Sequence, residues 1–437
     1  MKKIRLLLVK MIRLILVKMG RGGSLPGRLA LKFDPSLFQR FQYPECLIVV
    51  TGTNGKTTTS NLIVESLMRS GLKVIGNRKG DNLREGIATL LIANCDLGYR
   101  INCDAIVLEV DELTVPRVFK QLPVTHFIIN NLFRDQLDRS GEMETIIRKI
   151  AQVLDDYENT LILNANDPNV LRFKLYADKA KIKTFAICAS PASSSFNDEA
   201  SEGRFCPICQ QGLEYDYYQY SHIGQFHCPN GDFSTGRADL YVSEIDEEKQ
   251  LFKVDDEWIE MFQPSIYALY NCAAVLCLMK VLDLDFAAAR ETFKSFVMKD
   301  GRNETFMIRG YPTTLNLIKN PTGANEVMKA IVKDGRAKTV LIILNDNEQD
   351  GTDVSWIWDA HFELVMDENT TQIICSGTRA YDMALRVKYQ GFQGKLKVVE
   401  NLQEAVDCCT SLQQVRYVIA TYTALRSTRQ LLRRLEG

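Results

Sequence analysis

The sequence has 437 residues, which is enough for two or three domains that each bury a hydrophobic core. Its 53 Lys and Arg residues nearly balance its 54 Asp and Glu residues, so no charge field over the whole chain indicates a nucleic-acid-binding protein. Most of the twelve cysteines stand singly in apolar segments, as Cys272 and Cys277 do, which is typical of reduced core cysteines and favours the cytoplasm. No stretch combines the length and the freedom from charge of a membrane-spanning helix.

Residues 1–45 are predicted to form a basic amphipathic segment followed by a linker. The first 20 residues hold six bases and no acid, and the bases interrupt the apolar run too often for a signal peptide. On a helix, one side would carry the apolar side chains Ile4, Leu8, Met11, Ile12 and Ile15. Two interpretations stay open: residues 1–19 lie in the plane of an anionic membrane surface, or the helix packs on its own domain or on a partner protein.

The segment 46–60, CLIVVTGTNGKTTTS, consists of an apolar β-branched run, a Gly-rich turn and a series of hydroxyl residues. This order predicts a strand, a phosphate-binding turn and the start of a helix, because the N–H groups at a helix N-terminus face an anion. Lys56 adds a positive charge to the turn, and the hydroxyl of Thr57 stands where a Mg²⁺ ligand is expected. An ordinary strand-turn-helix is the alternative, but it does not explain why the glycines, the lysine and the threonines fall in register.

Strands and helices are predicted to alternate after this turn, which indicates a parallel sheet with crossover helices. The predicted strands span 47–50, 73–75, 105–110, 126–130 and 160–163. The third of them ends in AIVLEVDE, and a carboxylate at that position can reach a metal ion held by a phosphate turn on a neighbouring strand. Glu109, Asp111 and Glu112 are the candidates, and capping of the following turn remains the alternative for Asp111 and Glu112.

Two further polar segments follow predicted strand ends. Asp135 and Asp138 lie three residues apart after the strand at 126–130, and this place favours a site role over a solvated helix face. The string LNANDP, with Asn164 and Asp167, follows the strand at 160–163, where a plain Asx turn is the structural alternative. Both segments are therefore expected at the same edge of the sheet as the phosphate turn.

Residues 201–238 are predicted to form an inserted cysteine module. Three of its cysteines follow zinc-ribbon spacing: Cys206, Cys209 and Cys228. Asn230 or Gly231 stands where the fourth cysteine is expected, and neither residue supplies a thiolate. Two interpretations stay open: His222 or His227 completes a Zn²⁺ site, or the module is a metal-free hairpin held together by its tyrosines.

The last third of the chain is predicted to alternate strands and helices again, with strands at 314–318, 340–345, 372–376, 396–399 and 417–421. It has no G-x-G-x-x-G string, so no dinucleotide site is predicted. The segment 344–363 begins at a strand end and concentrates Asp346, Asp350 and Asp353 with two tryptophans, which indicates a contact area for another molecule. The alternative is a turn at Asp350-Gly351 with the tryptophans in the core. The residues alone do not distinguish Asp353 from Asp350 as a functional carboxylate.

Four strings of the sequence resemble those of Mur ligases: GTNGKTTT, AIVLEVDE, LNANDP and SIYALYNCAA. The string KNPTG and the segment 344–363 narrow the resemblance to the MurT family, the ligase-like subunits of lipid II isoglutaminyl synthase in Gram-positive bacteria. The resemblance implies an α/β fold with a Mur ligase-like central domain at 46–300, which holds a parallel sheet and a P-loop-type ATP site. It also implies a cysteine ribbon inserted at 201–238 and a Rossmann-like α/β domain at 301–437 that contacts a glutaminase partner.

The same resemblance implies roles for individual residues. ATP would be bound by the phosphate turn and by two residues far from it in sequence: Thr53, Asn54, Gly55, Lys56, Thr57, Thr58, Asn271 and Arg302. Mg²⁺ would be bound by Thr57 and Glu109. Catalysis would involve Lys56, Glu109 and Asp353, the last of which would orient the catalytic histidine of a GatD-like glutaminase in a heterodimer.

The implied reaction is the ATP-dependent amidation of the D-glutamate α-carboxylate in the lipid II stem peptide to D-isoglutamine, through an acyl phosphate and with ammonia from the glutaminase. The expected location is the cytoplasm, as the cysteines indicate, and contact with the inner face of the plasma membrane stays open together with the role of residues 1–19. Two alternatives stay open: a Mur- or folylpolyglutamate-type ligase that adds an amino acid, and a nucleotide-binding scaffold that docks a partner. Amino-acid-adding Mur ligases have an Asp-Tyr-x-His string where this chain has Leu317-Ile-Lys-Asn-Pro321, and this departure favours ammonia.

Overall fold

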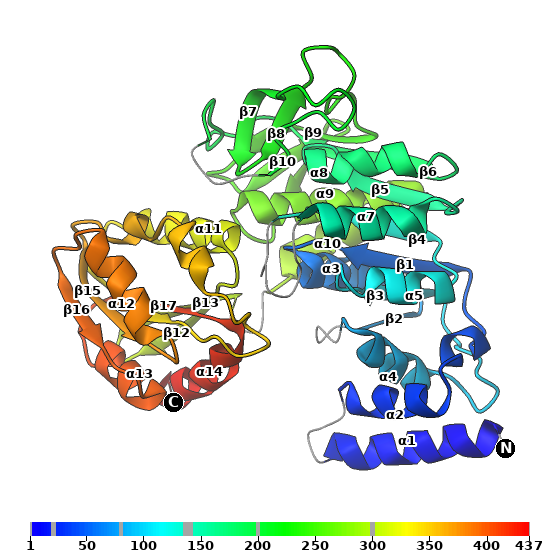
Figure 1. Cartoon of the computed structure of the whole chain (residues 1–437), viewed down its shortest axis with the longest axis horizontal. Helices are drawn as coiled ribbons and strands as arrows, with labels where there is room; N and C mark the ends of the chain where they lie inside the picture. The colour runs from blue at the N-terminus through cyan, green and yellow to red at the C-terminus, as the bar shows by residue number, and fades with distance from the viewer. Residues whose placement is uncertain are drawn as a thin grey trace. The chain divides into compact units, whose positions relative to one another are not determined.

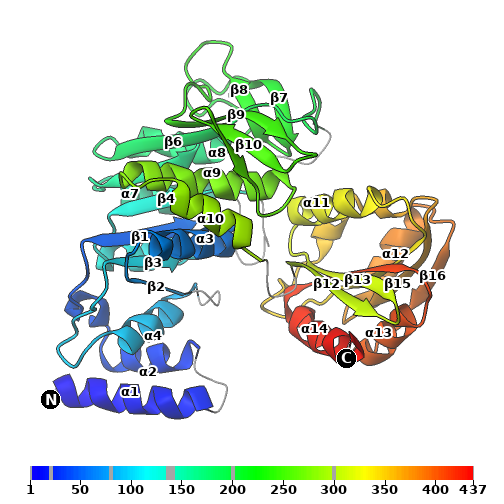
Figure 2. The ribbon, with the colours of Figure 1, turned by 180° about the vertical axis from the view of Figure 1, so that it is seen from behind.

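The computed structural model describes residues 2–18, 23–77, 82–133, 143–197, 202–297 and 302–436. These residues divide into two compact units, one of which ends at Phe296 while the other begins at Val297. Each unit is built around its own sheet with helices on both faces, as Figure 1 and Figure 2 show from opposite sides. The predicted α/β fold with parallel sheets is confirmed.

The first unit contains a nine-stranded sheet in the order β11-β10-β9-β6-β5-β4-β1-β3-β2. Its strands are β1 (Cys46–Thr51), β2 (Val74–Gly76), β3 (Ala105–Glu109), β4 (His126–Ile129), β5 (Thr160–Asn164), β6 (Lys181–Ile187), β9 (Leu240–Asp246), β10 (Leu251–Val254) and β11 (Glu257–Glu260). The strands from β9 to β2 are parallel, and β10 and β11 are antiparallel additions at one edge. Because β1 lies between β4 and β3, the chain builds the sheet first toward one edge and then toward the other. Ligands bind beyond the carboxyl end of such a central strand.

The strand β1 is apolar throughout because both of its faces are buried. Leu47 and Val49 enter one core, and Ile48 and Val50 enter another. The first core is covered by α1 (Lys2–Lys18), α2 (Leu25–Phe33), α4 (Arg84–Asn94), α5 (Val115–Val118), α7 (Met143–Leu154) and α8 (Pro168–Leu171). The second core is covered by α3 (Lys56–Arg69), α9 (Ile266–Val281) and α10 (Ala287–Ser295). The strand and the turn after it are thus held rigidly from both sides.

The amino-terminal helix α1 packs on the first unit through one of its faces. Leu6 and Val9 are 3% and 6% exposed and belong to the first core. Leu8, Met11 and Ile15, from the apolar side that the sequence predicts, are instead 53%, 53% and 58% exposed. The helix therefore packs on its own domain, but through the face opposite the apolar side that the sequence predicts. No helix in the described part of the chain is long and apolar enough to span a bilayer.

The insertion between β6 and β9 forms an antiparallel hairpin of β7 (Glu214–Tyr220) and β8 (Ile223–His227). Its small core contains Cys206, Cys228, Phe226 and Phe233. β6 and β9 are parallel neighbours in the large sheet, and Leu240 at the start of β9 pairs with Phe185 near the end of β6, so the insertion leaves and re-enters the sheet near the end of β6. The insertion is thereby attached beside the carboxyl ends of β5 and β6.

The second unit contains a six-stranded sheet in the order β12-β13-β17-β14-β15-β16. Its strands are β12 (Arg302–Ile308), β13 (Tyr311–Leu317), β14 (Lys338–Ile343), β15 (Thr370–Ser376), β16 (Lys395–Val398) and β17 (Val415–Ala420). All neighbours are parallel except β12 and β13. One face is covered by α11 (Pro321–Val332) and α12 (Ala380–Tyr389), and the other by α13 (Leu402–Thr410) and α14 (Tyr422–Glu436).

Candidate active site and cysteine cluster

The turn between β1 and α3 holds two glycines in conformations that other residues rarely adopt. The φ angle is +138° at Gly52 and +80° at Gly55. A Cβ atom at Gly52 would stand 2.9 Å from the carbonyl oxygen of Asn131, and one at Gly55 would stand 2.4 Å from Oδ1 of Asn271. Both positions therefore require glycine for space as well as for backbone conformation. The backbone of the turn can curl tightly in the way that a phosphate cradle needs.

Helix α3 begins at Lys56, directly after this turn, and its N-terminus is the centre of the candidate site. Gly55 is the N-cap and has no side chain to accept hydrogen bonds from the first N–H groups. Together with the helix dipole, this arrangement suits a bound anion. Thr59, in the first turn of α3, donates from Oγ1 to Asn271 Oδ1 at 3.0 Å. This contact brings α9 against the phosphate turn. The contact of Asn271 with ATP stays a prediction.

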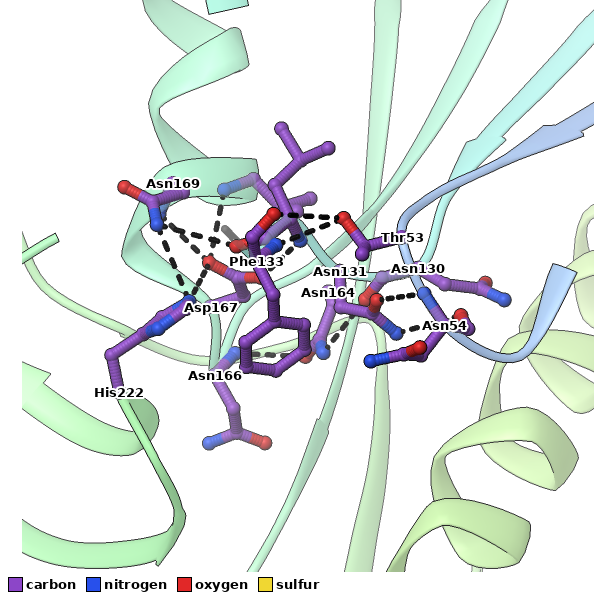
Figure 3. Close-up of polar contacts among 12 residues, drawn as sticks. Thr53, Asn54, Asn130, Asn131, Phe133, Asn164, Asn166, Asp167, Asn169 and His222 are labelled. Atoms are coloured by element: carbon purple, nitrogen blue, oxygen red, sulfur yellow. Dashed lines mark hydrogen bonds and ion pairs between the residues drawn. The ribbon is translucent and has the colours of Figure 1, made fainter. Parts of the chain in front are cut away.

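Asn131, which follows β4, clamps the phosphate turn. Its backbone oxygen accepts from Thr53 N at 2.9 Å, and its side chain accepts from Asn54 N at 2.8 Å and donates to Asn54 O at 3.0 Å. Thr53 Oγ1 also accepts from the N–H of Phe133 at 2.9 Å (Figure 3). Thr53 and Asn54, predicted as ATP contacts, are thus held in place by the next strand of the sheet. Asn131 was not among the residues predicted from the sequence, although a strand end followed by two asparagines was a signal.

Lys56 is buried at the mouth of the turn, with 8% of its side chain exposed. Its Nζ donates to the carbonyl oxygens of Gly52 and Thr53 and forms an ion pair with Glu112 Oε2 at 3.0 Å. Glu112 therefore compensates the charge of the buried ammonium group, which is a different role from the turn cap considered for it.

Glu109 lies at the end of β3, directly beside Val50 of β1 in the parallel pairing. Glu109 is 2% exposed, and its Oε1 accepts from Asn82 Nδ2 at 3.1 Å. Its Oε2 is buried and has no hydrogen-bond partner among the described residues. A buried carboxylate oxygen without a partner is costly unless something else satisfies it. A divalent cation satisfies such an oxygen, so the residues present fit a Mg²⁺ ion bound by Glu109 and by Thr57 at the start of α3.

Other predicted residues near this site have different outcomes. Asp111 Oδ1 accepts from the N–H of Leu113 at 3.1 Å, which is the capping role left open for it. Asp135 and Asp138 lie outside the described residues. Arg302 begins β12, and its side chain also lies outside the described part of the structure. The predicted contact of Arg302 with ATP stays a prediction.

Asp167 joins the strand ends to the inserted hairpin. It is fully buried, caps α8 by accepting from the N–H groups of Asn169 and Val170, and accepts from Leu132 N at 2.9 Å. Nε2 of His222, at the turn of the β7–β8 hairpin, lies 3.2 Å from Asp167 Oδ1 (Figure 3). His222 is therefore a structural partner of Asp167. The interpretation in which His222 completes a Zn²⁺ site is wrong, because its ring is turned toward Asp167.

The cysteine module gathers four potential metal ligands whose donor atoms all lie within 4.8 Å of one another: Cys206, Cys209, Cys228 and Asp232. Asp232 was not among the residues considered for the fourth position. The other histidine considered, His227, is turned toward Glu214, with 3.3 Å between its Nε2 and a carboxylate oxygen. Burial raises the pKa of Cys206, but hydrogen bonds from the N–H groups of Cys209 and Ile208 and from the side chains of Cys209 and Cys228 together outweigh that effect and leave the pKa below its usual value. Three sulfurs and a carboxylate form a donor set that suits Zn²⁺.

The second unit separates the two aspartates that the sequence could not distinguish. Asp350 is 4% exposed and accepts hydrogen bonds from the N–H and the hydroxyl of Thr423, so it caps α14. Asp353 is half-buried, and its Oδ1 accepts from Ser355 N at 2.8 Å. Trp358 follows on the same surface segment and is 50% exposed. Asp350 therefore has a structural role, and Asp353 is the carboxylate that a partner protein could reach.

Comparisons with known proteins match both units. The model of the Mur ligase middle domain matches residues 50–231, and that of the MurT ligase C-terminal domain matches residues 317–425. The MurT subunit of lipid II isoglutaminyl synthase (glutamine-hydrolyzing) from Staphylococcus aureus (strain COL) is 32% identical over 420 residues, which are 95% of this chain and 94% of the relative. The chain belongs to the MurT family. The MurT subunit from Streptococcus pneumoniae (strain ATCC BAA-255 / R6) is 31% identical, with 95% and 93% coverage.

Membership in the MurT family makes the chain an ATP-dependent ligase of the Mur type. Among solved structures, a pseudomurein peptide ligase type C from Methanothermus fervidus superposes with a TM-score of 0.66 at 19% identity, over 91% of this chain and 80% of that one. At this identity the likeness concerns the fold alone. The Mur ligase fold predicted from the sequence strings is confirmed.

Proposed function

We propose that this MurT-family chain amidates the α-carboxylate of the D-glutamate in the lipid II stem peptide to D-isoglutamine, with ATP forming an acyl phosphate that ammonia displaces. The observation that carries the proposal is the match along 95% of the chain to subunits of lipid II isoglutaminyl synthase. The site supports it, because the anion-binding start of α3 and the buried Glu109 suit phosphoryl transfer.

The residues of the chain divide the phosphoryl-transfer step between them. The N–H groups of the phosphate turn hold the transferring group, and Lys56 leaves Glu112 to stabilise the charge that develops on it. Thr57 and Glu109 would hold Mg²⁺, which neutralises phosphate charge when bound. Asn131 keeps the turn in shape, so that little reorganisation accompanies the reaction.

We further propose that the ammonia comes from a GatD-like glutaminase bound to the second unit. The sequence has no Gly-x-Cys-x-Gly nucleophile string of its own. Large side chains are exposed on α12 at a spacing of four residues, and Trp358 is exposed near them: Tyr381, Leu385 and Tyr389 are 65%, 48% and 74% exposed. Trp358 and Tyr389 contact each other edge to face at 6.0 Å. Exposed aromatics of this kind are typical of an interface, and Asp353 on the same unit would orient the partner's histidine.

The cytoplasm is the proposed location, because the reaction consumes ATP and the twelve cysteines are all free. The cysteine cluster is proposed to hold Zn²⁺ with Asp232 as the fourth ligand. Its place beside β6 and its core of Phe226 and Phe233 give it a structural role rather than a catalytic one.

The experiment is mass spectrometry of lipid II after incubation with ATP, Mg²⁺, glutamine, the chain and its candidate glutaminase. The wild-type chain should produce the mass change of a carboxylate converted to an amide. Lys56→Ala should abolish it with either glutamine or ammonium as the nitrogen source, and Lys179→Ala, at an exposed ion pair, should not. ATP hydrolysis that needs a free amino acid, with no amide formed, would establish an amino-acid ligase instead. Unchanged product formation by Lys56→Ala would leave only a scaffold role.

A further inference from the structure

The helix α1 presents an apolar face that the first unit leaves uncovered. Five of its side chains form this outer stripe and are between 46% and 60% exposed: Leu7, Leu8, Met11, Leu14 and Ile15. Their spacing of one, four, seven and eight residues from Leu7 puts them on one side of a helix. Leu6 and Val9, which lie on the opposite side, are buried in the core. Figure 1 and Figure 2 both show α1 at the rim of its unit, with α2 on its inner side.

The helix is fixed in this orientation by its inner face. Lys10 Nζ donates to the carbonyl oxygen of Cys95, at the end of α4. Leu6 and Val9 pack with Ala30 and Leu31 of α2 in the same core. The outer stripe is therefore a preformed surface, and it needs no separate folding step to be exposed.

The outer stripe lies in the most basic part of the chain. Residues 1–33 contain nine Lys and Arg residues and no Asp or Glu. Taking these nine from the total of 53 leaves 44 bases against all 54 acids in the remaining residues, which therefore carry a net charge of −10. Arg28 and Lys32 of α2 are exposed next to α1, and so is Phe33, at 61%. An exposed apolar stripe and a basic segment of the sequence thus occur together at one helix.

We propose that the outer stripe docks on an anionic lipid bilayer, with α1 lying in the plane of the headgroups. An apolar stripe inserts among acyl chains near the headgroups, and Lys and Arg around it attract anionic lipids. A second copy of this chain is a poorer occupant, because two segments that each contain nine bases and no acid would repel each other. The inference stands apart from the proposed function, since it concerns neither ATP nor the reacting carboxylate.

The test is co-sedimentation of the full-length chain with vesicles of phosphatidylcholine, with or without phosphatidylglycerol, in the absence of ATP and lipid II. The chain should bind the vesicles that contain phosphatidylglycerol, and added salt should weaken the binding. The double variant Met11→Glu and Ile15→Glu should bind these vesicles at least about tenfold more weakly. A matched control replaces two side chains of the second unit with similar exposure, Met307→Glu and Leu385→Glu, and should bind as the wild type does.

A second variant, Arg28→Glu with Lys32→Glu, leaves the outer stripe intact. It should weaken binding to the vesicles that contain phosphatidylglycerol and should not change binding to vesicles of phosphatidylcholine. Circular dichroism of each variant checks that it is folded. Equal binding of the wild-type chain and of both variants would overturn the proposal. So would a wild-type chain that ignores vesicles but forms a dimer in solution that Met11→Glu and Ile15→Glu dissociate, because a second copy would then occupy the stripe.

Discussion

The phosphate turn of the first unit and the acidic segment of the second unit, residues 344–363, differ in how their polar side chains are held. Around the turn, Lys56 has three oxygen partners, and Asn131 holds two consecutive residues in place. In the acidic segment, Asp353 is half-buried and accepts from a neighbouring N–H group. The proposed function interprets this difference as a division of labour: the ATP half of the reaction would lie within this chain, and the glutamine half would need residues from another chain.

The largest expected effect tests the second half of that comparison. Asp353→Asn should lower glutamine-driven amidation by up to about 10⁴-fold, as expected when the carboxylate of a triad is neutralised, and should leave ammonium-driven amidation unchanged. Product formation with each nitrogen source measures both rates. Glu348→Gln, at an exposed acid nearby, is the control. Equal loss with both nitrogen sources would mean that Asp353 acts in the ligase step and that the comparison is wrong.

Glu109→Gln tests the first half. The variant keeps an oxygen for Asn82 but loses the charge that a metal ion needs, so it should raise the Mg²⁺ concentration for half-maximal ATP turnover by at least about tenfold. A Mg²⁺ titration of ATP hydrolysis measures the effect. Asp111→Asn, which can keep its hydrogen bond to Leu113, should leave the titration unchanged. An unaltered Mg²⁺ requirement in Glu109→Gln would remove Glu109 from the metal site.

The cysteine cluster sharpens the comparison inside the first unit. Asp232→Ala should lower zinc affinity by about tenfold or more, and His227→Asn should leave it unchanged, because only Asp232 lies within the cluster. Competition with a chelator followed by metal analysis of the purified chain distinguishes the two variants. If His227→Asn releases zinc as readily as Asp232→Ala does, the assigned fourth ligand is incorrect.

The smallest effect concerns stability rather than activity. Asp350→Ala removes the acceptor of the Thr423 N–H group at the start of α14 and should lower the free energy of unfolding by about 1–2 kcal/mol. Asp353→Ala should change it by less than about 0.5 kcal/mol, as is usual for surface substitutions. Urea unfolding of the two variants gives both values. The reverse order of stability would exchange the structural and functional roles of the two aspartates.

Local patterns in the sequence were sufficient to predict the elements that build the candidate site. The apolar run before the phosphate turn predicted β1, and the positions of Gly55 and Lys56 predicted a turn that opens a helix. These features depend on neighbouring residues, because backbone conformation and helix termini are set within a few positions of the chain. Glu109 could be placed for the same reason, since the carboxyl ends of parallel strands share one edge of a sheet.

The partners of these residues were decided by the tertiary structure. Glu112 meets Lys56 across 56 positions, Asn131 reaches Asn54 across 77, and Thr423 selects Asp350 across 73. The burial of Leu6 rather than Leu8 likewise follows from where α2 and α4 lie. Spacing along the chain does not predict such contacts, because they form only when separate elements pack together. Each buried polar group then forms a hydrogen bond with a partner that packing has brought near it. The sequence by itself determined the phosphate turn, the place of Glu109 at a strand end and the family strings. Packing determined that Asp350 is buried as a helix cap, whereas Asp353 stays half-buried at the surface.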